Sequence, residues 1–334
     1  MRILISLFFI FLTATVLKAQ NPRFSMFDAS PLVVNPAYAG KINGSVRAGT
    51  HFGVHLSDSA EIRHLNTYVD FRTAVKGDKR TNHLGIGLNF YTYGFNSQSP
   101  VIANFPSLSL AYHMGLGKTG KHFLGIGAQL AYASARLDET KGLYDKELSG
   151  GGFRYVPTAN RRNTTARNSY WDASGGVYYQ FKGEDVEFET GLSMYHMFYP
   201  KNDIYKTDQE TRLRHRGVMN MRMQMKLSKK RSIAFQSMYW ADGLYWRSRV
   251  YDSDNLVAFW TGVEVLNIKA ENGFSVDYGI YSRTFRTFMP YLSLHFNKVL
   301  NFRMSYEWPF NSTAFESNRA KRGEAALIFN FSKK

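Results

Sequence analysis

The stretch that decides the fold runs from residue 214 to residue 227 and reads Arg-His-Arg-Gly-Val-Met-Asn-Met-Arg-Met-Gln-Met-Lys-Leu. From Met219 to Leu227, every second side chain is apolar. The polar positions between them are Asn220, Arg222, Gln224 and Lys226. Successive side chains of a β-strand point to opposite faces, so this pattern predicts a two-faced strand. In a helix the same methionines would be scattered around the surface.

The methionine face has two candidate environments. In a soluble β-sandwich it would pack into a core, where alternation is also the rule. In a membrane barrel it would face lipid, and the polar positions would line a lumen. A transmembrane strand needs roughly 9–11 alternating residues, and this stretch is long enough. The number of times that the pattern recurs therefore decides between the two environments.

The same alternation recurs along the chain, in segments separated by connections that are alternately short and long. These segments are residues 45–53, 64–72, 84–90, 107–114, 124–132, 171–181, 188–194, 219–227, 233–240, 257–266, 274–282, 288–296, 300–308 and 324–331. Bacterial single-chain barrels have an even number of strands. The sequence thus predicts an all-β fold, a single transmembrane up-and-down antiparallel β-barrel of about 14 strands, with twelve or sixteen as alternatives.

The N-terminal segment and the distribution of apolar runs after it support an exported barrel. A basic start, an apolar run from Ile3 to Leu17 and a small residue at Ala19 predict a secretory signal peptide over residues 1–19. A membrane-anchoring helix is the alternative, but the run is short for one. No later apolar run is long enough for a membrane helix, and only helices and closed barrels satisfy their backbone in lipid. We therefore expect an integral protein of the outer membrane, with its barrel over residues 45–334.

Residues 20–44 form an irregular segment before the first predicted strand. Pro22, Pro31 and Pro36 interrupt it, and its apolar residues follow no lasting period. Such a segment still has to bury its apolar side chains. We expect it to pack in the barrel lumen or at the periplasmic mouth. The Leu-Gly-Ile-Gly repeats at Leu84 and Leu124 indicate strands that leave lumenal space.

Two long loops, residues 135–168 and 241–255, are the predicted partner-binding surface. Arginine and large aromatic residues are enriched at the energetic centres of protein interfaces. The loops combine these types at Arg154, Tyr155, Arg161, Arg162, Arg167, Tyr245, Trp246, Arg247 and Arg249. The alternative is a solvated surface beside lipopolysaccharide phosphates, which basic side chains also suit. Tyr251 extends the second loop's aromatic set.

Four arginines at inward positions of predicted strands also have two possible roles. Arg216, Arg222, Arg283 and Arg303 would each cost about 2–4 kcal/mol on the lipid face near the midplane. We expect them to pair with the inward acids Glu264, Asp277 and Glu307. The competing interpretation is an anion-attracting pore or a binding site for an acidic segment.

The sequence offers no candidate for catalysis, a metal or a cofactor. It has no cysteine, which excludes thiol chemistry and thiolate metal sites. None of the nine histidines has a metal-binding spacing, and His113, His196 and His295 are expected within strands. No Gly-x-Ser-x-Gly nucleophile motif is present. The formal charge of +16 suits anionic lipid or an acidic protein. We do not expect a nucleic-acid partner outside the cytoplasm.

The segment Asn35-Pro36-Ala37-Tyr38-Ala39-Gly40 resembles the N-terminal signature of the PorP/SprF family. Residues 175–179, 191–200 and 323–331 are also similar to that family, in the same order along the chain. The resemblance implies an outer-membrane barrel of the type IX secretion system and gliding motility. Such a barrel would help secrete or hold a surface adhesin through that protein's C-terminal domain, together with other secretion components. The chain departs from the family in its basic loop at residues 135–168 and its Ser-Lys-Lys end.

Two functions from different classes follow. The first is a binding protein that aids secretion or surface anchoring of a partner. The second is an outer-membrane channel that prefers anions.

Overall fold

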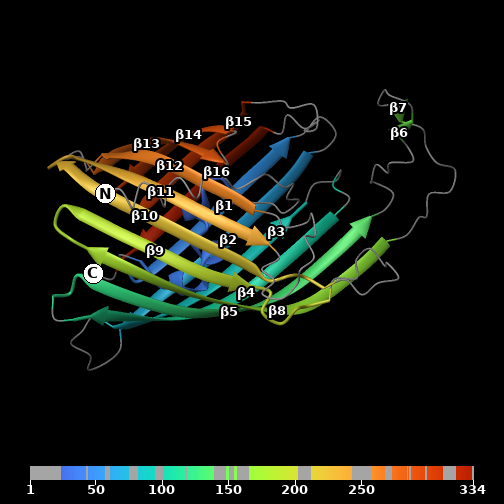
Figure 1. Cartoon of the computed structure of the whole chain (residues 1–334), viewed down its shortest axis with the longest axis horizontal. Coiled ribbons are helices and arrows are strands. Elements are labelled where there is room, and N and C mark those ends of the chain that lie inside the picture. Colours follow the sequence, from blue (N-terminus) through green and yellow to red (C-terminus); the bar gives the residue numbers. More distant parts are fainter. Residues whose placement is uncertain are drawn as a thin grey trace, which may run out of the picture.

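The computed structural model shows one closed barrel (Figure 1). It describes residues 24–42, 44–56, 61–74, 82–94, 99, 101–117, 119–138, 148–149, 154–155, 165–201, 212–242, 257–267, 273–283, 285, 287–297, 299–310 and 321–332. The predicted signal peptide lies outside the described residues. No helix among the described residues is both long and apolar enough to cross a membrane.

Fourteen strands of the described chain form the barrel, and each predicted segment falls within one of them or overlaps it. They are β1 (Val46–Leu56), β2 (Glu61–Ala74), β3 (His83–Tyr93), β4 (Val101–Leu116), β5 (His122–Asp138), β8 (Thr165–Lys182), β9 (Val186–Tyr195), β10 (Arg216–Ser228), β11 (Arg231–Asp242), β12 (Val257–Asn267), β13 (Phe274–Arg283), β14 (Thr287–Phe296), β15 (Leu300–Pro309) and β16 (Lys321–Phe331). The predicted all-β barrel of about 14 strands is confirmed.

The sheet closes by pairing its first strand with its last. Neighbouring strands are antiparallel throughout, and β1 pairs with β16 from Val46↔Phe331 to Leu56↔Lys321. Two further short strands, β6 (Leu148–Ser149) and β7 (Arg154–Tyr155), pair only with each other. Closure gives each of the fourteen barrel strands a neighbour on both sides, which is the condition for a sheet in lipid.

The alternation separates a lipid-type outer face from a polar lumen. In β10, Met219 is 39% exposed and Met221 is 41% exposed, whereas Asn220 between them is 7% exposed. In β3, Leu84, Ile86 and Leu88 are likewise exposed outward. The apolar side chains lie outside and the polar ones inside, which is the reverse of a soluble sandwich. The soluble alternative is therefore wrong.

The two ends of the barrel differ in their connections. At one end β1 begins and β16 ends, and we call it the terminal end. The strand connections there are short, as in the turn of residues 183–185 between β8 and β9. At the other end, the loop end, the connections include residues 139–164 and 243–256.

The described N-terminal segment, residues 24–42, lies inside the barrel, and we call it the plug. It contains η2 (Phe27–Ala29), α2 (Pro31–Val34) and η3 (Pro36–Tyr38). Each of the last two begins with a proline, whose fixed φ suits a first helical position. Asn35 caps η3 by accepting a hydrogen bond from the Ala37 N–H at 2.9 Å. Short turns of this kind let the plug fold back on itself within the lumen.

Candidate functional site

The second half of the plug, residues 35–40, lies against strand glycines on one side of the lumen. A Cβ added at Gly85 would stand 1.9 Å from the carbonyl oxygen of Ala39, and one at Gly176 would stand 2.1 Å from Asn35 Oδ1. No side chain fits at either position. We call Gly85, Gly87, Gly127, Gly176 and Gly191, contributed by β3, β5, β8 and β9, the glycine wall.

Asn35 fixes this half of the plug to the backbone of the barrel. Its Nδ2 donates to the carbonyl oxygens of Val177 at 3.0 Å and Leu192 at 3.3 Å. Asn35 is fully buried, and an unpaired buried amide costs about 1–3 kcal/mol. These bonds to β8 and β9 require close approach, which the glycines at 176 and 191 permit.

The end of the same motif is held by side chains from β2 and β4. The Gly40 N–H donates to Asp70 Oδ2 at 2.8 Å, and Gly40 has a φ of 71°, a conformation that favours glycine. His113 Nε2 lies 2.7 Å from the Ala39 carbonyl oxygen, to which it donates. Its Nδ1 lies 2.6 Å from the hydroxyl of Tyr178. Every residue from Asn35 to Gly40 is therefore buried in the lumen.

The first half of the plug, residues 24–30, meets ionisable side chains on another side of the lumen. Glu324 accepts the N–H groups of Ser25 at 2.6 Å and Met26 at 2.9 Å. The Ser25 hydroxyl donates to Glu307 Oε2 at 3.1 Å. We call His51, Arg303, Glu307 and Glu324, from β1, β15 and β16, the charged wall.

An ion pair and a histidine complete the charged wall. Asp28 of the plug pairs with Arg303 of β15. His51 bridges the plug and the barrel, with Nδ1 2.9 Å from the Ser30 hydroxyl and Nε2 3.2 Å from Glu324. The contact between Asp28 and Arg303 is charge-assisted, and such bonds are shorter and stronger than neutral ones. The plug is thus held by directional bonds to strands on several sides of the barrel.

Burial and neighbouring charges shift the pKa values of three plug residues. Burial alone would raise the pKa of Asp28, but Arg303 and Arg222 outweigh it and hold that pKa below its ordinary value. Burial lowers the pKa of Lys41, and its partner Glu189 opposes that shift. Burial also raises the pKa of the Tyr38 hydroxyl well above its ordinary value, so this hydroxyl stays protonated.

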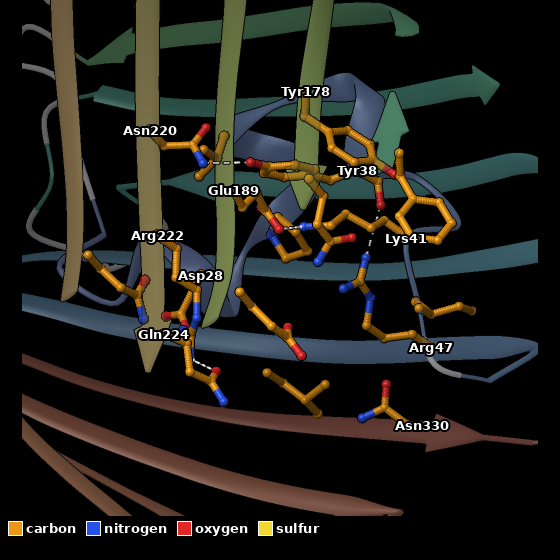
Figure 2. A pocket seen from close by; sticks show the side chains of 18 of the residues that line it. Asp28, Tyr38, Lys41, Arg47, Tyr178, Glu189, Asn220, Arg222, Gln224 and Asn330 are labelled. Atoms are coloured by element: carbon orange, nitrogen blue, oxygen red, sulfur yellow. Dashed lines mark hydrogen bonds and ion pairs between the residues drawn. The ribbon is translucent and has the colours of Figure 1, made fainter. Parts of the chain in front are cut away.

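A cavity of about 820 Å³ lies between the plug and the strands (Figure 2). Plug residues such as Asp28, Tyr38 and Lys41 form one part of its lining. Its cationic lining residues are Lys41, Arg47, Arg72, Lys182, Arg222 and Arg303. Its carboxylates are Asp28, Glu187 and Glu189. Because the cations outnumber the carboxylates, the cavity lining is basic.

The four predicted lumenal residues share the inward face of β10. The amide of Asn220 donates to the Tyr38 hydroxyl, and Arg222 and Gln224 line the cavity. Lys226 lies on the same face but close to the strand end, where it is exposed.

The arginine pairing is confirmed in two cases and differs in two others. Arg222 lies 3.6 Å from Glu264, and Arg283 lies 2.7 Å from Glu307. Arg303 pairs with Asp28 of the plug instead of an acid on a strand. Arg216 stacks over the Trp240 ring, with 4.6 Å between the guanidinium carbon and the ring centroid. Asp277, the third acid predicted as an arginine partner, contacts a histidine: its Oδ2 lies 2.6 Å from His295 Nε2.

The predicted partner-binding residues are only partly within the described chain. Arg161, Arg162, Tyr245, Trp246, Arg247 and Arg249 lie outside it. Arg154 and Tyr155 form β7, which pairs with β6. Arg167 is exposed, but it lies in β8 opposite Arg136, because β5 and β8 extend into the predicted loop. The structure does not bring these residues together into a described surface.

The histidine prediction needs one correction. His113 and His295 lie in β4 and β14, as expected. His196 lies directly after β9, has a φ of 60° and bonds Asp172 at 2.8 Å. The chain leaves the strand there, so the alternation that suggested a strand position ends one residue earlier. No group of three or more potential metal-binding residues occurs within the described part of the chain.

Sequence reasoning missed the residues that hold the plug, chiefly Asp28, Glu189 and Glu324. Their partners lie far away along the chain, as Ser25 and Glu324 show with a separation of 299 positions. The Leu-Gly-Ile-Gly repeats were the available signal, because Gly85, Gly87 and Gly127 accommodate the plug.

Comparison with solved structures finds similar barrels. The CymD monoaromatic hydrocarbon channel is 11% identical, with a TM-score of 0.51 over 93% of this chain and 94% of that one. A TodX deltaS2S3 mutant, also a monoaromatic hydrocarbon channel, is 11% identical, with a TM-score of 0.50 over 90% and 94% of the two chains. The Pseudomonas putida toluene transporter TodX is 10% identical, with a TM-score of 0.48 over 94% and 98%. At these identities the likeness to CymD and the TodX mutant shows the fold alone.

The family comparison reaches further. None of the curated proteins compared with this chain matches it. Residues 16–321, which include the plug, the glycine wall and most of the charged wall, match the type IX secretion system membrane protein PorP/SprF. That span is most of the chain, and its barrel fold agrees with an outer-membrane location. The chain therefore belongs to the PorP/SprF family of type IX secretion system membrane proteins.

Proposed function

We propose that this barrel acts as a membrane platform that aids secretion or surface anchoring of a partner protein, without catalysis. The partner would be a secreted adhesin, held through its C-terminal domain, and the platform would work with other secretion components. One observation carries the proposal, namely that the chain's own N-terminal segment occupies the lumen. Family membership supplies the secretion context.

The plug favours a platform over a diffusion channel. Its polar contacts reach β1, β2, β4, β5, β8, β9, β10, β15 and β16. A typical intramolecular hydrogen bond contributes about 0.5–1.5 kcal/mol, so expelling the whole plug would cost several such bonds. A barrel whose lumen is filled in this way is suited to present a surface.

The loop end is the side on which we place the partner. Outer-membrane barrels have short periplasmic turns and longer external loops. Residues 139–164 and 243–256 would then lie outside the cell, where arginine and aromatic side chains meet either cargo or lipopolysaccharide phosphates. Charge would speed the encounter, and aromatic contacts would slow dissociation.

A loop deletion tests this arrangement. Because β8 begins at Thr165, the deletion should remove residues 150–162 and spare the strand. A matched control removes residues 312–318 from another loop-end connection. We expect both variants to assemble as heat-modifiable barrels, and only the first to release the surface adhesin into the medium. Wild-type display of the adhesin by the first variant would contradict the proposal.

The anion-preferring channel is the second candidate, and the basic cavity lining favours it. Planar-bilayer conductance separates the two functions. A platform should give little current until the plug is displaced. A wild-type protein that conducts anions steadily, with a current that falls in Arg222→Gln, would support the channel instead.

A further inference from the structure

The 820 Å³ cavity opens at the end of the barrel opposite the long loops. Its lining includes Gly44, Asn330 and Ser332, which flank the start of β1 and the end of β16. It also includes Lys182 and Glu187, which flank the short turn between β8 and β9. These positions all belong to the terminal end. The cavity is therefore separate from the loops assigned to cargo above.

Six cations line the cavity, and four of them are neutralised within the chain. Arg47 bonds Asp70 through two nitrogens, at 2.8 and 2.9 Å. Lys41, Arg303 and Arg222 pair with Glu189, Asp28 and Glu264, respectively. These pairs fix the cavity wall and the plug, and they leave little charge for a ligand.

Arg72 and Lys182 differ from the other four cations. Arg72 donates to the carbonyl oxygen of Ile42 at 3.1 Å, and Lys182 lies 5.4 Å from the centre of the Phe123 ring. Within the described chain neither has a carboxylate partner at ion-pair distance. Both are exposed, and they project from β2 and β8 into the same cavity. Glu187 on the rim offsets part of this charge, since it stands opposite Lys182 in the register of β8 and β9.

The remainder of the lining suits a peptide better than a small ion. Phe123, Phe188 and Ile328 provide apolar surface, and Gln180 and Asn330 provide amide donors and acceptors. Ligand pockets for molecules larger than an ion have about 300–1,000 Å³ and combine these two kinds of surface. The cavity lies within the ring of strands. A lipid headgroup could therefore enter it only if the acyl chains of that lipid left the membrane.

The surrounding rim would attract an acidic segment. Lys226, Lys229, Lys230 and Arg231 lie at the β10–β11 turn of the same end, and all four are exposed. Clustered charge of one sign raises the local concentration and the association rate of oppositely charged partners.

We propose that the cavity at the terminal end binds an acidic, extended peptide segment of a second partner protein. Arg72 and Lys182 contact its carboxylates, and the lining amides bind its backbone. The connections at the terminal end are short, as the periplasmic turns of outer-membrane barrels are, so this partner lies on the periplasmic side. The site is independent of cargo display at the loop end, so either idea can fail alone.

Binding to the full-length protein in detergent tests the proposal. The probe is a fluorescent eight-residue peptide that alternates glutamate with alanine, compared with the same peptide carrying glutamine. We expect the acidic peptide to bind the wild type at least about tenfold more tightly than the glutamine peptide. Lys182→Glu, which alters an exposed side chain, should weaken binding by about tenfold or more, and the double variant Arg72→Gln/Lys182→Gln should do the same.

The control variant Lys229→Gln/Lys230→Gln removes two charges from the rim but none from the cavity. It should slow association and change the dissociation rate little. Equal weakening by the rim and cavity variants would show unspecific attraction and overturn the proposal. Equal affinity for the two peptides would overturn it as well. Displacement of the peptide by glycerophosphoglycerol at similar concentration would assign the site to a headgroup, and would also overturn it. Heat-modifiable migration verifies that each variant is folded.

Discussion

The glycine wall and the charged wall hold the same plug by opposite means. At the glycine wall the plug approaches the strand backbone because no side chain stands between them, as at Gly85 and Gly176. At the charged wall long side chains reach inward to the plug, as Glu324 does to Ser25 and Met26. The glycine wall depends on the absence of side chains, and the charged wall depends on ionisable side chains. Steric and electrostatic changes should therefore affect the two walls differently.

The largest effect is expected from Gly85→Ala. The new methyl group would meet the Ala39 backbone, which cannot rotate away, whereas in Gly87→Ala the nearest atom is the flexible Leu32 side chain at 2.8 Å. Overpacking costs about 1–3 kcal/mol, so Gly85→Ala should lower the temperature of heat-modifiable unfolding clearly and Gly87→Ala less. Gly85→Ala should also raise bilayer conductance, because a displaced plug opens the lumen.

Gly323→Ala is the control on a strand of the charged wall, since its nearest non-neighbouring atom would be 4.0 Å away. It should leave both measurements unchanged. Equal effects of alanine at positions 85 and 323 would remove the steric distinction between the two walls.

The second effect concerns Glu324→Gln, which keeps the shape of the side chain and removes its charge. The carboxylate now accepts one backbone N–H group on each of its oxygens. The amide keeps one acceptor oxygen and turns an NH2 group toward the other backbone N–H, which leaves that donor unsatisfied. An unsatisfied buried donor costs about 1–3 kcal/mol. We expect faster protease cleavage within residues 24–30, measured by mass spectrometry, with the Asn35–Gly40 segment still protected. Cleavage throughout the plug would mean that the two walls do not act separately.

The smallest effect is the response of the Asp28–Arg303 pair to acid. The pKa of Asp28 lies below its ordinary value of 3.8, so the pair stabilises the fold above that value. This contribution is lost as the pH falls through the lowered pKa. We expect Asp28→Asn to be less stable than the wild type at pH 7, and the difference to shrink as the pH falls below about 4. A constant difference across this range would assign the effect to shape.

The sequence predicted the barrel well because alternation is a local signal. Every second residue from Met219 to Leu227 reports its face, and the same holds for the other thirteen segments. Strand ends were less certain, as β5 and β8 show by extending into the predicted loop of residues 135–168. Beyond a strand's apolar positions the alternation gives no signal about where the hydrogen-bonded ladder stops.

The site could be predicted only in part, because its contacts join distant parts of the chain. The motif Asn35–Gly40 is recognisable, and the glycines at 85 and 127 indicate free space. Nothing local connects Asp28 with Arg303, which are 275 residues apart. The plug sequence has no regular alternation of apolar and polar residues that would predict its position. That position depends on contacts with the folded barrel.

The pairing of β1 with β16 has a consequence for assembly. The plug is synthesised before the strands. The acceptor of two of its N–H groups, Glu324, lies on β16, which pairs with β1 to close the sheet. The two N–H groups of Ser25 and Met26 therefore stay without this acceptor until the last hairpin arrives. We expect a chain that stalls before β16 to leave residues 24–30 without these two bonds and more accessible to periplasmic proteases. The plug would in this way mark whether a barrel has been completed.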